Sequence, residues 1–153
     1  MNAPAAHRLA VRVYYEDTDA GGVVYHASYL RFAERARTEL LRAHGLDHRG
    51  LAEHALGHLV VRRCLADFLA PARLDDLLEI ETVATRLGGA SLTLLQTVRR
   101  GEVPLVRLEV EIAFVGPDGR PRRLPAALRG AFGAGRVGAL PRRAALEPRG
   151  SIV

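Results

Sequence analysis

The stretch from Tyr14 to Tyr29 joins an alternating strand pattern to an amphipathic helix pattern through an acidic loop. Gly21-Gly22 permits backbone angles that other residues avoid, so we expect the loop to fold back and bring Asp19 close to the start of the helix. A carboxylate and His26 beside the positive end of a helix are groups suited to hydrolytic chemistry. The loop holds three carboxylates, on Glu16, Asp17 and Asp19.

The residues on either side of this loop have the periodicity of regular structure. Before it, apolar residues recur at every second position, which is typical of a half-buried strand: Leu9, Val11, Val13 and Tyr15. After it, residues 28–44 predict a helix that Ser28 can cap and Gly45 can end. Its buried side is predicted to comprise Leu30, Ala33, Arg37, Leu40 and Leu41, with Tyr29, Phe32 and Ala36 beside them.

The remainder of the chain is dominated by strand patterns. Residues 46–57 are compatible with a short helix or a loop, and a second short helix is predicted at 125–132. Turns at residues 71–76, 88–89 and 101–102 separate four predicted strands, 58–69, 77–87, 91–100 and 103–115.

These elements predict an α+β fold in which a five-stranded antiparallel sheet wraps around one long central helix. The four later strands are expected to form a consecutive meander. The edges of such a sheet need cover, which favours a homo-oligomer.

Composition narrows the classes of function. The formal net charge is +5 and all 22 basic residues are arginine, which reflects either genomic base composition or a surface that attracts phosphate-rich partners. No recognition helix or aromatic platform is evident, so no nucleic-acid partner is predicted. His48, His54 and His58 lack the spacing of a zinc site, and no metal is predicted.

The single cysteine, Cys64, is expected in the core and fits a reducing compartment. No signal peptide and no apolar run of about 20 residues is evident, so we predict a cytoplasmic protein with at most peripheral membrane association.

The run from Val11 to Tyr29 resembles the signature of the 4-hydroxybenzoyl-CoA thioesterase class of hotdog-fold proteins. It is more similar to the Tol-Pal-associated (YbgC-like) acyl-CoA thioesterases, as are residues 34–41 and 70–80. The resemblance implies a hotdog domain over residues 9–132. Residues 1–8 are then expected to be a flexible N-terminus and residues 133–153 a disordered tail rich in Arg, Ala and Gly.

The resemblance also implies roles for individual residues. Asp19 matches the catalytic aspartate, acting as a nucleophile or as a general base. His26 matches the position whose backbone N–H polarises the thioester carbonyl, and its side chain can assist. No cofactor is implied beyond the coenzyme A of the substrate, and the partners implied are an acyl-CoA, an acyl carrier protein and further copies of the chain, as a dimer or a homotetramer. The residues expected to bind substrate or CoA are Tyr14, Val24, Tyr25, Arg86 and Ser91.

Other interpretations remain open at this point. Asp19 can instead serve only an Asx turn, and His26 can be a buried, hydrogen-bonded histidine. A hotdog dehydratase or hydratase would place its acid on the central helix, where Glu34 and Glu39 are available. A non-enzymatic adaptor for acyl carriers or phospholipid synthesis at the inner membrane is a further alternative. The acyl preference is not encoded in any linear motif.

Overall fold

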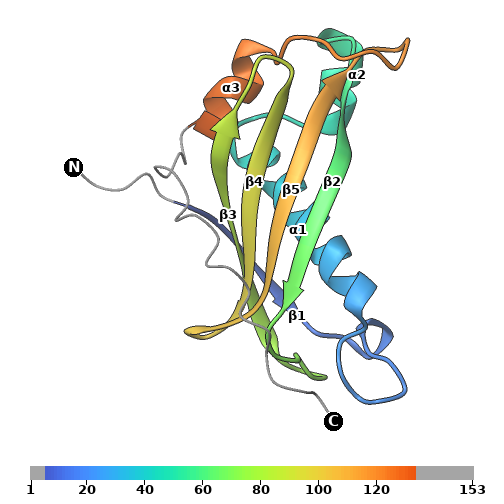
Figure 1. Ribbon diagram of the computed structural model, residues 1–153, viewed down its shortest axis with the longest axis vertical. Helices are drawn as coiled ribbons and strands as arrows, with labels where there is room; N and C mark the ends of the chain where they lie inside the picture. Colours follow the sequence, from blue (N-terminus) through green and yellow to red (C-terminus); the bar gives the residue numbers. More distant parts are fainter. Residues whose placement is uncertain (1–5, 134–153) are drawn as a thin grey trace, which may run out of the picture.

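The computed structural model describes residues 6–133, in which a five-stranded antiparallel sheet curls around one long helix (Figure 1). The predicted tail, residues 133–153, lies outside the described residues except for Gly133, which belongs to the last helix. The strand order is β1-β3-β4-β5-β2. The elements are β1 (His7–Arg12), a 3-10 turn (Tyr15–Asp17), α1 (His26–Ala43), α2 (His48–His54), β2 (His58–Phe68), β3 (Leu77–Leu87), β4 (Ser91–Arg100), β5 (Val103–Val115) and α3 (Ala126–Gly133).

The alternation in the sequence correctly predicts the strands of the sheet centre. Strands β3, β4 and β5 have the predicted bounds, and β5 buries every second residue against α1: Val106, Leu108, Val110, Ile112 and Phe114. In the first strand Val11 and Val13 are buried as predicted, but Tyr15 is 83% exposed. The prediction for Tyr15 is wrong because the chain leaves the sheet at Arg12 and turns at Tyr15.

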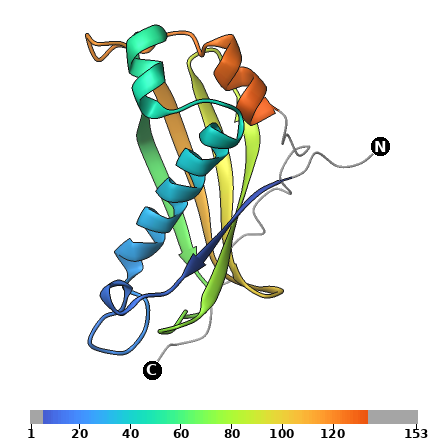
Figure 2. The same cartoon turned by 180° about the vertical axis from the view of Figure 1, so that it is seen from behind.

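The prediction of a four-strand meander is wrong for β2. Strand β1 pairs with β3, so the position beside β3 is occupied, and β2 pairs with β5 at the opposite edge. Residues 69–76, of which 71–76 were predicted as a simple turn, therefore cross the end of the sheet (Figure 2). We call them the crossing segment.

The long helix begins two residues earlier than predicted. Its N-cap residue is Tyr25, while Ser28 is fully buried inside the first turn and its Oγ donates to the carbonyl oxygen of Asp17 at 3.2 Å. Gly45 ends the helix in the left-handed region, at φ 74°, as predicted. Leu30 is 43% exposed, contrary to the prediction that it faces the core.

Strand β2 is the most exposed strand of the sheet. Cys64 lies on it and is exposed, so the prediction that it belongs to the core is wrong. The outer edge of β2 faces no other strand in residues 6–133, and large apolar side chains remain exposed along it at Val60, Val61 and Phe68.

Two glycines give opposite predictions for stability. A Cβ at Gly57 would lie 2.6 Å from both Phe114 Cζ and the carbonyl oxygen of Val115, whereas a Cβ at Gly130, within α3, meets nothing within 4 Å. We expect Gly57→Ala to lower the free energy of unfolding by about 1–3 kcal/mol through overpacking. Gly130→Ala should raise it by up to about 1 kcal/mol because alanine favours the helix. Urea titration of both variants measures this, and equal effects would contradict the packing described here.

Candidate active site

The loop that carries Asp19 folds into a small hairpin. Thr18 pairs with Val24, the N–H of Asp19 donates to the carbonyl oxygen of Val23 at 2.9 Å, and the N–H of Gly22 donates to that of Asp19 at 3.0 Å. Gly22 adopts φ 79°, which glycine accepts without strain. The loop therefore folds back as the two glycines predict.

The carboxylate of Asp19 is exposed and held on one side only. Its Oδ1 accepts from the N–H of Gly21 at 2.8 Å, which is an Asx turn, and no side chain of residues 6–133 donates to its Oδ2. The turn fixes the orientation of the carboxylate and leaves one oxygen free for a substrate or a water molecule.

The first turn of α1 presents free backbone donors. The N–H of Tyr25 donates to the carbonyl oxygen of Asp17 and that of Ser28 to Tyr25, but no carbonyl of the described chain accepts from the N–H of His26 or Ala27. These two amides lie at the positive end of the helix dipole. They can stabilise negative charge on an oxygen atom placed beside them.

An aromatic cluster surrounds this end of the helix. The ring of His26 lies 4.4 Å from the ring of Tyr25 and 6.4 Å from that of Phe68, which in turn lies 5.9 Å from the ring of Tyr29. His26 itself is exposed, so the buried-histidine alternative is wrong. Phe68 comes from the end of β2 and was not anticipated, because its position depends on β2 occupying the far edge.

The crossing segment fixes the hairpin to the body of the protein. The buried hydroxyl of Tyr29 accepts from the N–H of Ala72 at 3.0 Å, and the carbonyl oxygen of Ala72 accepts from the N–H of Val24 at 2.9 Å. Val23 also forms a bridge with Arg73. Burial raises the pKa of the Tyr29 hydroxyl, which therefore stays protonated at neutral pH.

Asp76 secures the crossing segment and predicts a pH dependence. Its Oδ2 accepts from the N–H of Arg73 and from the Arg100 guanidinium, both at 2.9 Å, and the bond from Arg73 is the largest cause that lowers the pKa of this carboxyl below 3.8. A carboxyl whose pKa is lower in the folded state stabilises the fold at pH values above its unfolded pKa. That contribution is lost as the pH falls through the folded value.

We therefore expect Asp76→Asn to be less stable than the wild type at neutral pH, with the difference shrinking below about pH 4. Urea titrations of both proteins between pH 7 and pH 2.5 measure the difference. If the difference in the free energy of unfolding between the two proteins grew as the pH fell, the assigned direction of the Asp76 pKa shift would be wrong.

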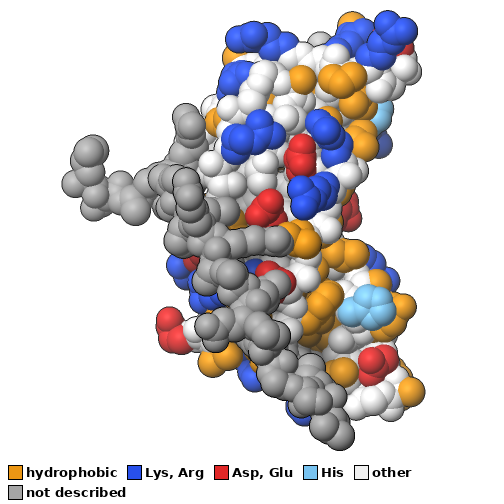
Figure 3. Space-filling model, viewed as in Figure 1, with side chains coloured by type: hydrophobic (Ala, Val, Ile, Leu, Met, Phe, Trp, Pro, Cys, Tyr) orange, Lys and Arg blue, Asp and Glu red, His pale blue; other side chains and the backbone are white. Residues whose placement is uncertain are grey.

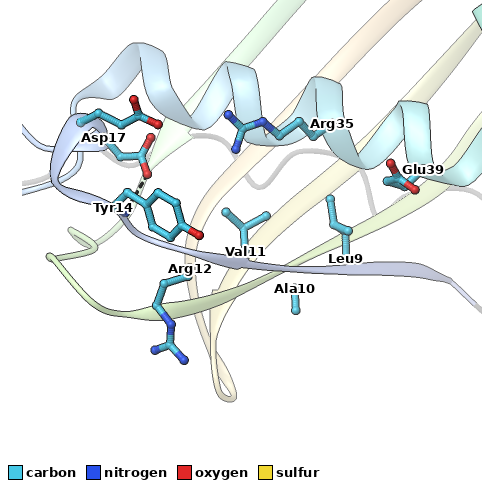
Figure 4. A pocket seen from close by; sticks show the side chains of 9 residues that line it. Leu9, Ala10, Val11, Arg12, Tyr14, Asp17, Arg35 and Glu39 are labelled. Carbon is cyan, nitrogen blue, oxygen red and sulfur yellow. Dashed lines mark hydrogen bonds between the residues drawn. The ribbon is translucent and has the colours of Figure 1, made fainter.

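Asp17 and Tyr14 lie on the other side of the loop. The carboxylate of Asp17 is buried and its Oδ2 accepts from the N–H of Tyr14 at 2.8 Å, so Asp17 braces the loop. The Tyr14 ring points into a groove of about 360 Å³ between β1 and α1, whose wall includes Arg35 and Glu39 (Figure 4).

The four predicted substrate-binding residues other than Tyr14 divide into two groups. Val24 and Tyr25 lie beside Asp19 and His26, with Val24 buried and Tyr25 partly exposed. Arg86 and Ser91 lie at the β3–β4 hairpin, at the opposite end of the molecule from the hairpin of Asp19 (Figure 1). There the Arg86 guanidinium donates to Ser91 Oγ at 3.1 Å. One copy of the chain does not bring the two groups together.

Residues 6–133 have neither a candidate metal site nor a candidate membrane-spanning helix. Residues 6–133 contain no cluster of His, Cys, Asp and Glu side chains arranged to hold a metal ion. None of the helices in this range is long and apolar enough to cross a membrane.

Comparison with known proteins is consistent with this geometry. The family model described as "Thioesterase superfamily" matches residues 21–107, which begin just after Asp19. The chain is 48% identical over 128 residues to the acyl-CoA thioester hydrolase YbgC of Escherichia coli O6:H1, covering 82% of this chain and 94% of that protein. It is 47% identical over 105 residues to the acyl-CoA thioesterase YbgC of Haemophilus influenzae, covering 69% and 77%.

Solved structures extend the likeness to three dimensions. A probable thioesterase from Bartonella henselae superposes with a TM-score of 0.77 at 45% identity, covering 79% of this chain and all of that one. The sequence resemblance and the hotdog fold that it implies are thereby confirmed. The chain belongs to the thioesterase superfamily and is a hotdog-fold thioester hydrolase.

Proposed function

We propose that this protein hydrolyses acyl-CoA thioesters to the free acid and CoA, with Asp19 as the reacting carboxylate. The observation that carries the proposal is that the hairpin holding a half-free Asp19 carboxylate leads directly into the start of α1, where two backbone amides have no acceptor in the described chain. The YbgC relatives, whose names state this substrate class, support it.

The proposed reaction has two variants that use the same geometry. As a general base, Asp19 removes a proton from water, whose oxygen attacks the thioester carbonyl carbon. As a nucleophile, Asp19 attacks that carbon itself and forms an anhydride, which water then hydrolyses. In both variants the N–H groups of His26 and Ala27 stabilise the oxyanion. In both variants the oxyanion collapses by breaking the C–S bond, and the CoA sulfur leaves as a thiolate that takes up a proton. In the nucleophilic variant this collapse forms the anhydride, so the thiolate leaves before water acts.

A dimer formed through β2 would complete the site. Pairing of β2 with a second β2 would cover the open edge and bury its exposed apolar side chains, Val60, Val61 and Phe68. Phe68 packs beside His26, so the interface would border the reacting groups. Because Arg86 and Ser91 lie at the opposite end of the molecule from Asp19, a second copy of the chain would supply them to a shared site.

We expect Val60→Asp to shift the protein toward the monomer because it adds a charge to the pairing edge. Sedimentation velocity at several protein concentrations measures the shift, with Glu102→Gln, at the β4–β5 turn, as a surface control. A wild-type protein that sediments as a monomer at every concentration would rule out the shared site.

The end of the molecule near α3 is strongly basic. Arginine side chains crowd the upper part of the face shown in Figure 3. Within residues 6–133 no carboxylate lies within 4 Å of the guanidinium groups of Arg86, Arg120, Arg122, Arg123 and Arg129. Such a surface suits the phosphates of CoA or the acidic surface of an acyl carrier protein.

The test is the identification of products from acyl-CoAs with short, long and aromatic acyl groups, and from the matching acyl carrier protein thioesters. Mass spectrometry should detect the free acid and free CoA in stoichiometric amounts. If only the carrier-protein thioesters were hydrolysed, the substrate would be an acyl carrier protein thioester rather than an acyl-CoA. If neither set were hydrolysed, the non-enzymatic adaptor alternative would be favoured.

The dehydratase alternative is less well supported. Glu39 pairs with Arg42 at 3.3 Å, and Glu34 has no hydrogen bond to a histidine in the described chain. The cytoplasmic location and the association with the Tol-Pal system remain predictions.

A further inference from the structure

A second cavity, of about 120 Å³, lies further along α1 from the proposed catalytic groups. Apolar side chains form most of its wall: Leu41, Leu59, Ile112 and Phe132. Two charged side chains of α1, the exposed Glu34 and the half-buried Arg37, also line it, together with the imidazole of His48, which is hydrogen-bonded to Thr38 Oγ1 at 3.1 Å. Charged side chains in the wall of a mostly apolar cavity can hold a polar group of an otherwise apolar ligand.

The Arg37 side chain is held in place by a buried polar network. Its Nη1 donates to Gln96 Oε1 at 2.8 Å, while Gln96 Nε2 donates to the carbonyl oxygen of Ala33 at 2.9 Å and to Thr82 Oγ1 at 3.0 Å. Gln96 and Thr82 are almost completely buried, so two polar side chains occupy core positions of the sheet and form the network that holds Arg37. Both amide hydrogens of Gln96 are used, which fixes the direction of the Arg37 guanidinium.

The charge of Arg37 is not neutralised by a contact within residues 6–133. No carboxylate there lies within 4 Å of its guanidinium, and only one of its five N–H donors has a partner. Burial lowers the pKa of Arg37, and the more distant charge of Glu34 opposes that shift. A half-buried cation with free donors favours a ligand that supplies an oxygen acceptor.

The cavity lies in line with the proposed oxyanion site. His26, Leu30, Glu34 and Arg37 follow one another at spacings of four, four and three residues, so they form one stripe along α1. Leu30, the exposed apolar residue of this stripe, lies between His26 and the cavity at Arg37. Strand β2 runs alongside, with Phe68 near His26 and with Leu59 and Val61 at the cavity.

The length of this stripe indicates the size of the ligand. Arg37 follows His26 by eleven residues, or about 16 Å at 1.5 Å per residue, and helical side chains lean back toward the N-terminus. An extended chain advances about 1.2 Å per bond, so an acyl chain of about twelve carbons spans the distance.

We propose that Arg37 and Glu34 recognise a hydroxyl group at the far end of an acyl chain of about twelve carbons whose thioester lies at His26. A hydroxyl suits both residues because it accepts from the guanidinium and donates to the carboxylate, whereas a carboxylate ligand would be repelled by Glu34. The inference rests on the proposed acyl-CoA hydrolysis and adds its acyl specificity.

The experiment compares kcat/KM for 12-hydroxydodecanoyl-CoA with that for dodecanoyl-CoA in the wild type and in Arg37→Met. A hydrogen bond to a charged group predicts a preference of about tenfold to a hundredfold for the hydroxylated chain in the wild type. Arg37→Met should bring the ratio to one or below, while butanoyl-CoA, which is too short to reach the cavity, keeps its wild-type rate. Arg42→Met is the matched control, since Arg42 is on the same helix but exposed and paired with Glu39.

A second variant and a binding measurement test the role of Arg37 even if Arg37→Met folds poorly or no turnover is seen. Arg37→Lys retains the charge without the planar fork and should keep part of the preference, even if Arg37→Met folds poorly. Calorimetric titration with the corresponding non-hydrolysable thioether analogues of CoA measures the same ratio without turnover. Equal affinity for both chains, or a preference that survives Arg37→Met, overturns the inference while leaving thioester hydrolysis intact. Failure to hydrolyse any acyl-CoA, with the binding ratio preserved, would instead overturn the proposed function alone.

Discussion

Asp19→Asn should reduce kcat by about 10²–10⁴-fold, the range that a positioned acid or base contributes. Asparagine lacks the negative charge that both variants of the proposed reaction require. Its side-chain oxygen can still accept from the N–H of Gly21, so the turn that orients the side chain is retained. The free energy of unfolding should therefore change by less than about 0.5 kcal/mol, as for most exposed positions. Steady-state thiol release and urea titration of the same preparation measure both quantities.

Asp47→Asn is the matched control for this variant. Asp47 is also exposed, and its Oδ1 accepts from the N–H of Gly50 at 2.6 Å at the start of α2, so the substitution changes the same chemical group in a similar turn. Its kcat should equal that of the wild type. If Asp47→Asn lost as much activity as Asp19→Asn, the loss would not report on a catalytic carboxylate.

His26→Pro should lower kcat by about 10²–10³-fold, as expected when one donor of an oxyanion site is removed. His26 is the first residue of α1, a position that accepts proline readily because its N–H has no partner within the helix. Tyr25 has φ −61° and ψ 134°, which is close to the polyproline II conformation that a residue before proline can adopt. The substitution therefore removes the N–H with little cost to the helix, and thiol release again gives the rate.

His26→Ala separates the backbone from the side chain. Alanine removes the imidazole and keeps the N–H, so a backbone role predicts that His26→Ala is much more active than His26→Pro. Equal losses in the two variants would assign the effect to the imidazole and contradict the role of the amide. Circular dichroism of both variants checks that α1 remains formed.

The fold could be predicted from the sequence where periodicity decides the structure. The alternation of apolar and charged residues along β5 fixes which side of the strand meets α1, and Gly45 fixes the end of that helix. The position of β2 could not be predicted in this way. A strand pattern specifies that a strand forms but not its neighbour, and β2 reaches the far edge because β1 already occupies the place beside β3.

The candidate site was predictable only in part for the same reason. Asp19 and His26 are close in sequence and joined by a glycine turn, so their proximity follows from local geometry. Phe68 lies at the site because β2 occupies the far edge of the sheet and the chain then crosses back over residues 69–76. No local sequence pattern predicts this crossing. Arg37 was expected to lie on the buried side of α1, but its partner Gln96 is 59 residues away and carries no local signal of the contact.

The most direct test of the account is the rate of thiol release from a single acyl-CoA by the wild type and by Asp19→Asn, purified and assayed side by side. We predict that the wild type releases CoA and the free acid in equal amounts and that the variant, folded to the same extent, releases them about 10²–10⁴ times more slowly. Wild-type turnover that persists in Asp19→Asn would contradict the assignment of Asp19, and with it the site at the start of α1.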